Sequence, residues 1–280
     1  MGVRSTALAL LVVGCAHTPE TSSTGRGAGP EPLPETLRPE IERVTRVGRQ
    51  IFAQDRASAR ATDVWLARVS EERRRQGHGW VTLGGPPWKV VFLEGPPGDE
   101  RVGFEVSLPA DVDPGSGILA AVEPPRPLEP EEALRRRMIR TAAAAVKASS
   151  GTPMNPVVLP PDADGPEGWR VYFLNSTSRR GETVIGGHLR IRVSEDGSTV
   201  LGVDRLSQCL VQRQAPVGAR TMELMAGTPL FDTPNEGHVF AAMSNALPLN
   251  LATYKTSPRA WYIQPDGTVI FNGSFPGPGR

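Results

Sequence analysis

The chain has 280 residues, with 31 lysines and arginines against 30 acidic residues, so its formal net charge is +1. A balance this close to neutral lacks the basic excess of nucleic-acid-binding proteins, and we expect no nucleic-acid partner. No apolar run reaches the roughly 20 residues that a transmembrane helix needs. The hydrophobic content of 39% is that of a globular protein, so a folded domain is expected.

The first residues indicate a targeting segment. Arg4 supplies a positive charge, and a short apolar run covers residues 7–13. The run ends in Val-Val-Gly-Cys at Cys15, which resembles the lipobox of bacterial lipoproteins. The resemblance implies that residues 1–14 are a signal peptide and that Cys15 carries fatty acyl chains, palmitate among them. Since alanine and not aspartate follows Cys15, it also implies the outer membrane, facing the periplasm. The alternative is an ordinary secretory signal with an incidental cysteine.

Residues 15–35 are rich in Thr, Ser, Gly and Pro and offer almost nothing to bury, which is typical of a flexible tether after a lipidated cysteine. The first folded half is expected over residues 36–126. There, apolar residues at helical spacing predict a helix over residues 36–74, capped by Thr36 and broken near residues 58–62. Two strands are predicted after it, at residues 88–93 and 101–108.

The second half is expected over residues 127–272, after a Pro-rich connection. A helix with an apolar stripe comes first, on Leu134, Met138, Ala142, Ala145 and Val146. Its arginines at 135–137 and 140 indicate a solvated face, with phosphate binding as the alternative. The pattern W-[K/R]-V-x-F-L occurs at Trp88 and again at Trp169, and each copy follows a helix and precedes another strand. We therefore expect an α+β fold with helices packed on antiparallel sheet, built as two related helix–strand–strand halves.

A central β-meander is expected between Trp169 and Val211. Leu189, Ile191 and Val193 alternate with polar residues, which predicts one buried and one solvent-exposed face. Residues 195–197, Glu-Asp-Gly, suit a three-residue hairpin loop with Gly197 in the left-handed conformation.

That loop length fixes the register of the hairpin. It places His188 opposite Asp204 on the exposed face, beside Arg190 and Arg192. The bland interpretation is a surface charge pair that sets the register. The sharper one is a recognition patch formed by His188, Arg190, Arg192 and Asp204.

Residues 233–236, Thr-Pro-Asn-Glu, predict a capping box at the start of a short helix. Strands are expected at residues 248–253, 259–264 and 268–271. The tail at residues 273–280 is rich in Gly and Pro, and we expect it to lack structure.

Candidates for chemistry are few. The histidines are scattered and form no metal-binding motif, so no metal or other cofactor is expected. Cys209 is the one candidate nucleophile, with His188 or His238 as its base and Glu236 or Asp204 as the residue that orients this base. The predicted register points Cys209 toward the core and away from His188. A lipidated Cys15 would also leave Cys209 without a disulfide partner.

Four blocks of the chain look like blocks in a group of uncharacterised bacterial exported proteins. They are Phe-Ala-Gln-Asp-Arg-Ala from Phe52, Gly-Gly-His-x-Arg from Gly186, Asp-Arg-Leu-Ser-x-Cys-Leu from Asp204, and Thr-Pro-x-Glu-x-His-Val-Phe from Thr233. The resemblance implies no activity, cofactor or catalytic residue. The expected function is a lipid-anchored envelope protein with a non-catalytic binding or structural role, whose partner is the membrane together with an envelope protein or polymer. The alternatives are a thiol or histidine hydrolase using Cys209 and a small-molecule-binding protein.

Overall fold

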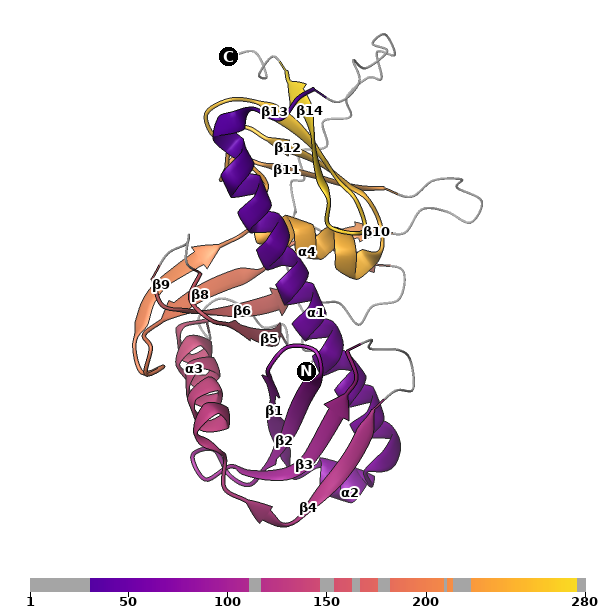
Figure 1. Cartoon of the computed structure of the whole chain (residues 1–280), viewed down its shortest axis with the longest axis vertical. Coiled ribbons are helices and arrows are strands. Elements are labelled where there is room, and N and C mark those ends of the chain that lie inside the picture. Colours follow the sequence, from indigo (N-terminus) through magenta and orange to yellow (C-terminus); the bar gives the residue numbers. More distant parts are fainter. Residues whose placement is uncertain are drawn as a thin grey trace, which may run out of the picture.

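The computed structural model of the protein describes residues 31–110, 117–146, 154–162, 167–175, 182–208, 211–213 and 223–275. The described part contains four α-helices and three four-stranded sheets, with the helices packed against the sheets. The predicted α+β class is confirmed. Figure 1 shows the helix α1 running the length of the molecule past all three sheets. Cys15 and Cys209 lie outside the described residues.

Helix α1 spans Arg38–Arg68 and follows a single 3-10 turn, Glu35–Leu37. Thr36 does not cap it as predicted, because the chain enters through that turn and the N-cap residue Leu37 has no capping side chain. The predicted break near residues 58–62 is also wrong. Ser58 is buried within the continuous helix and bonds both the carbonyl of Gln54 and the hydroxyl of Thr82. The helix ends at Arg68 instead, and a four-residue helix, α2 (Glu71–Arg74), follows.

The first sheet is a meander of four antiparallel strands in sequence order. Its strands are β1 (Gly77–Leu83), β2 (Trp88–Glu94), β3 (Arg101–Leu108) and β4 (Ile118–Arg126). Only β2 and β3 were predicted from the sequence. The last third of α1 covers one face of this sheet, where Ala57, Ala61 and Val64 pack with residues of β2 and β3.

The second sheet follows helix α3 (Pro130–Val146) and is again antiparallel, in the order β5-β6-β8-β9. Its strands are β5 (Met154–Leu159), β6 (Trp169–Asn175), β8 (Leu189–Val193) and β9 (Val200–Arg205). Helix α3 covers one face through its predicted stripe, although Ala145 is exposed. The middle of α1 and helix α4 cover the other face.

The third sheet contains the one parallel pair among the described strands. Its elements are β11 (Leu224–Thr228), α4 (Glu236–Asn245), β12 (Leu249–Thr253), β13 (Arg259–Ile263) and β14 (Val269–Ser274). Strands β11 and β12 are parallel because α4 connects them as a crossover, and the rest of the sheet is antiparallel. Gly273 and Ser274 lie in β14, so the tail prediction is wrong for these two residues.

The repeated sequence pattern falls on equivalent strands of the first two sheets. Trp88 begins β2 and Trp169 begins β6, and each of these is the second strand of its meander. Each meander is preceded in the chain by a helix that packs on one of its faces. A short ladder of β7 (Glu182–Val184) with β10 (Val211–Arg213) is added only in the second half. The predicted boundary near residue 126 lies between β4 and α3.

None of the helices in the described part of the chain is both long and apolar enough to cross a membrane.

Candidate functional site

The β8–β9 hairpin differs in register from the prediction by two residues. Arg190 pairs with Asp204 and Ile191 with Val203, while the amide of Leu206 donates to the carbonyl of His188. His188 is therefore not opposite Asp204. The difference arises at the turn, where the Ser194 amide donates to the Thr199 carbonyl around a four-residue loop, and a bulge follows at Val193.

Two predictions about this hairpin are confirmed. Gly197 has a φ of +71°, which is the left-handed conformation expected of it. Leu189, Ile191 and Val193 form the buried parity under α3. However, Leu201 and Val203 are 45% and 51% exposed, although the predicted register turned them toward the core. They lie on β9, which is an edge strand of the sheet.

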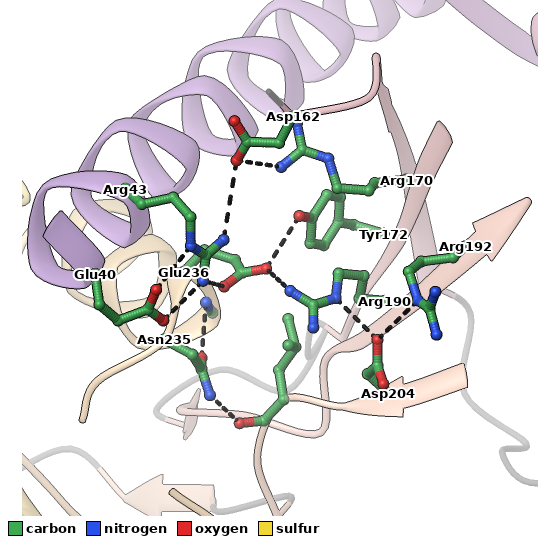
Figure 2. A network of polar contacts seen from close by, with 12 residues as sticks. Glu40, Arg43, Asp162, Arg170, Tyr172, Arg190, Arg192, Asp204, Asn235 and Glu236 are labelled. Carbon is green, nitrogen blue, oxygen red and sulfur yellow. Dashed lines mark hydrogen bonds and ion pairs between the residues drawn. The ribbon is translucent and has the colours of Figure 1, made fainter. Parts of the chain in front are cut away.

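The opposite face of the hairpin was predicted to be open to solvent, and this prediction is wrong. Helices α1 and α4 cover it, so the side chains of Arg170, Tyr172 and His188 are buried there. Arg190 retains 14% of its side-chain exposure and Arg192 retains 26%. The predicted recognition patch is therefore largely an internal polar cluster between the second sheet and two helices (Figure 2).

Glu236 is at the centre of this cluster. It is the first residue of α4, and its fully buried carboxylate accepts hydrogen bonds from the Tyr172 hydroxyl at 3.1 Å and from Arg190 Nη1 at 2.7 Å. Arg43 of α1 lies 4.0 Å from its second oxygen. A carboxylate is stabilised at a helix N-terminus by the unpaired amides and the helix dipole. One side chain thus connects α4, the second sheet and α1.

A second group of charges surrounds Asp162. Its carboxylate accepts hydrogen bonds from Arg46 at 3.1 Å and from Arg170 at 3.2 Å, and Arg43 lies 3.9 Å away. Burial alone would raise the pKa of Asp162, but the hydrogen bond from Arg46 and the positive charges of Arg170 and Arg43 together lower it. The carboxylate is therefore held ionised between α1 and β6.

The outer edge of the cluster contains the charged residues that the sequence identified. Arg190 Nε donates to Asp204 Oδ2 at 3.0 Å, and Arg192 Nε lies 3.7 Å from the same oxygen. Arg190 therefore has two carboxylate partners, one internal and one at the edge. The whole cluster contains five guanidinium groups and four carboxylates, on residues Arg43, Arg46, Arg170, Arg190, Arg192, Glu40, Asp162, Asp204 and Glu236.

The capping box of α4 is displaced by two residues from the predicted one. Asn235, not Thr233, is the N-cap, and its Oδ1 accepts from the amides of Gly237 and His238. The side chain of His238 completes the box by accepting from the Asn235 amide through Nδ1 at 3.1 Å. Glu236 is thereby released from the capping role predicted for it and is free to bind Tyr172 and Arg190.

His188 and His238 are both buried as neutral rings. Nδ1 of His188 accepts from the Asn175 amide at 3.1 Å, and the ring contacts Phe240 edge-on at a centroid distance of 5.2 Å. Burial, with a smaller contribution from His238, lowers the pKa of His188 to about 3. Burial also lowers the pKa of His238 to about 4. In each ring the nitrogen that would accept a proton already accepts a backbone hydrogen bond, which disfavours a role as general base.

Comparison with known protein families, curated proteins and solved structures finds no match to this chain. Within the described residues no three His, Cys, Asp or Glu side chains are placed to hold a metal ion. The cluster consists of mutually paired charges around two carboxylates, and it joins elements that are distant in the sequence.

Sequence reasoning missed most members of this cluster. Glu236 was considered only as a capping residue and as an orienter of a catalytic histidine, and Tyr172 only as a strand former. Asp162 was not considered at all. Arg43 lies on the predicted apolar helix, where its position beside Val44 and Val47 gave no sign of a buried ion pair. The one available signal was Glu236 at the start of a predicted helix whose following residues are mostly apolar.

Proposed function

We propose that this chain is a lipid-anchored protein of the bacterial envelope whose folded part binds an envelope molecule without catalysing a reaction. The observation that carries the proposal is the pairing within the cluster. The polar side chains best suited to bind or react with a ligand are those of Glu236, Tyr172, Arg190 and Asp204. They form hydrogen bonds with one another. Groups committed to such pairs stabilise one arrangement of helices and sheet.

The hydrolase alternative receives less support from the geometry. A histidine that activates a thiol must take up a proton near neutral pH. The pKa values of His188 and His238, lowered to about 3 and about 4 by burial, keep both rings neutral there. Neither histidine therefore meets the requirement for the base that Cys209 would need.

The membrane attachment in this proposal rests on the sequence around Cys15. A single acyl chain binds a membrane reversibly, whereas several chains on one residue hold it firmly, since each buried methylene contributes roughly 0.8 kcal/mol. Replacing Cys15 with Ala should release the chain from the membrane fraction or block its processing. The matched control is Cys209→Ala, which removes the other cysteine and should leave fractionation unchanged. Retention of the Cys15→Ala chain in the membrane would refute the anchor.

The Cys15→Ala variant also tests the non-catalytic part of the proposal. The chain has two cysteines, so this variant retains Cys209 as its only thiol. Iodoacetamide should alkylate it no faster than free cysteine at the same pH, because no charged base activates it. A rate far above that of free cysteine, lost on replacing His188 or His238, would favour the hydrolase instead.

A further inference from the structure

A cavity of about 620 Å³ lies between α3 and the turn that joins β2 to β3. It is separate from the charged cluster around Glu236. Its lining combines one face of α3 with the connection before that helix and with the β2–β3 turn. The lining residues that matter here are Arg101, Arg136, Arg137 and Arg140, with Asp99 and Glu100. Four guanidinium groups thus share one hollow with two carboxylates.

The Glu100 carboxylate fixes the inner wall of this cavity. It accepts hydrogen bonds from the Gly98 amide at 2.9 Å and from Arg136 at 3.0 Å, and Arg140 lies 3.6 Å from it. Burial alone would raise the pKa of Glu100, but the bonds from Gly98 and Arg136 outweigh it and lower the pKa. Glu100 is therefore ionised and balances the charge of Arg136, which is itself mostly buried.

The other three arginines keep hydrogen-bonding capacity toward the cavity. Arg137 uses one nitrogen, Nη1, to donate to the backbone carbonyl of Asp196, and it forms no salt bridge in the described residues. Hydrogen bonds from Ser194 and Ser198 lower the pKa of Asp196, and the nearby charge of Arg137 lowers it further. Arg140 is half exposed, and its only ion pair there is the long one with Glu100. Arg101 is exposed at the start of β3 and makes no side-chain hydrogen bond or ion pair within the described part of the chain. The four guanidinium groups of the lining outnumber the carboxylates of Glu100 and Asp99, so the lining carries an excess of positive charge.

We propose that this cavity binds a small phosphorylated molecule, with its phosphoryl group held by Arg101, Arg137 and Arg140. Guanidinium groups bind phosphate oxygens through paired, charge-assisted hydrogen bonds, which favours phosphate over a neutral ligand. Pro127, Leu128 and Ala133 provide an apolar part of the lining for the organic portion of the ligand. The volume lies within the range of small-molecule sites.

Two features of the site give it selectivity. Arg136 is tied to Glu100 and to the carbonyl of His78 at 3.0 Å, so the guanidinium groups approach the cavity from a fixed helix face. The carboxylate of Asp99 repels a ligand with negative charge spread over its whole length and so favours charge concentrated at one end. The inference rests on the binding part of the proposed function, because it supplies the ligand class that the proposal leaves open.

The test uses the full chain in detergent with inorganic pyrophosphate as the probe. We expect pyrophosphate to raise the melting temperature and to bind in calorimetry. The double variant Arg137→Gln/Arg140→Gln should bind at least about tenfold more weakly, the effect of losing roughly 1.4 kcal/mol. The control Arg75→Gln/Arg205→Gln removes two exposed arginines that do not line the cavity and should bind normally.

Several results would overturn the inference. One is the absence of pyrophosphate binding at millimolar concentration, and another is equal loss in the control variant. Binding to phosphatidylglycerol vesicles but not to pyrophosphate would assign the arginines to a membrane surface instead. If the double variant melts at a lower temperature without ligand, Arg101→Gln alone replaces it, since Arg101 has no side-chain hydrogen bond or ion pair to lose in the described structure. The Cys15 and Cys209 experiments do not involve this cavity, so their outcomes remain separate.

Discussion

At the scale of single residues, the buried charges act mainly by specifying one arrangement. Moving Glu236 and Arg190 out of water has a desolvation cost that their attraction only partly offsets. Removing one partner is costlier, because the other charge stays buried and unpaired. Arg190 is therefore not the replaceable surface residue that the sequence suggested, since it holds both Glu236 and Asp204.

The neutral histidines make the fold sensitive to acid. The pKa of His238 is about 4 in the folded chain, against an ordinary value of 6.5. Between these values the unfolded chain binds more protons than the folded one, so the free energy of unfolding falls as the pH is lowered. Above the ordinary value both states are neutral and the histidine contributes no pH dependence. His188 acts in the same direction.

Replacing His238 with Gln should reduce this acid sensitivity. Glutamine can still accept from the Asn235 amide at the third position of the capping box, but it does not titrate. The free energy of unfolding, measured with urea, should fall between pH 6.5 and 4.5 less steeply in the variant than in the native chain, by roughly 1 kcal/mol per pH unit. Above pH 7 the difference in free energy of unfolding between the two proteins should not change with pH. An unchanged slope would mean that His238 is charged in the folded state.

The residues of the candidate site show what a sequence can reveal about a sheet. Alternation correctly identified Leu189, Ile191 and Val193 as one buried face. The polar parity looked exposed because alternation reports only polarity, and a helix bearing a carboxylate can cover a polar face. Nothing local to β8 indicates that Glu236, 46 residues after Arg190, supplies this cover. The register failed because neither the four-residue turn at residues 195–198 nor the bulge at Val193 is visible in the hydrophobic pattern.

At the scale of elements, two of the strands that the sequence missed contain proline. Strand β4 contains Pro124 and Pro125, and β5 contains Pro156. Proline lacks an amide donor and is tolerated in edge strands, where one side of the strand needs no partner. Both strands lie at the edges of their sheets. A sequence reader who treats proline as a connection will therefore lose these strands while finding the central ones.

The contact between α1 and α4 depends on a glycine. A Cβ placed on Gly48 would lie 2.5 Å from Cβ of Val239 and 3.1 Å from the carbonyl oxygen of Glu236. Glycine in the middle of a helix costs about 1 kcal/mol relative to alanine. That cost is retained here because the absent side chain lets the two helix backbones approach closely beside Arg43 and Glu236.

Replacing Gly48 with Ala should therefore destabilise the protein, against the intrinsic helix preference. Overpacking costs about 1–3 kcal/mol, which exceeds the gain of about 1 kcal/mol in helix propensity. The net loss should appear in urea unfolding as a lower midpoint with an unchanged slope. Since the clash involves backbone of α4, rotation of one side chain cannot relieve it. A gain in stability would show that α1 and α4 separate without cost.

At the scale of the whole molecule, α1 connects three separate cores. Ile41 and Val44 pack into the core of the third sheet, and Val47 and Ile51 into the core between the second sheet and α4. The last third of the helix packs on the first sheet. Figure 1 shows this succession along a single continuous helix. The three sheets are therefore expected to gain and lose structure together.

The repeated helix and meander explain why fold class was predictable while the assembly was not. Each half contains local signals that agree with one another, such as a helical stripe followed by strands that begin at Trp88 or Trp169. The continuity of α1 past residue 58 depends on contacts such as that of Ser58 with Thr82, which a local pattern does not contain. The parallel pair β11–β12 likewise depends on a crossover, since β11 itself was not predicted.

Replacing Ile51 with Ala tests whether α1 couples the three sheets. Ile51 is fully buried between the second sheet and α4, so its truncation should cost about 2–5 kcal/mol. If the molecule unfolds as one unit, hydrogen exchange of the slowest amides should accelerate by the same factor in β2, β8 and β13, although Ile51 contacts neither the first nor the third core.

The matched control for this experiment is Leu66→Ala on the same helix, where the side chain is 45% exposed and its truncation should change exchange little. Acceleration confined to β8, with β2 and β13 still protected, would contradict the coupling. In that case the interfaces along α1 would be separable, and the helix would join three independent folding units. Uniform acceleration has a simple physical cause, because a helix that unwinds at its centre can no longer hold Ile41 and Ala61 in their separate cores.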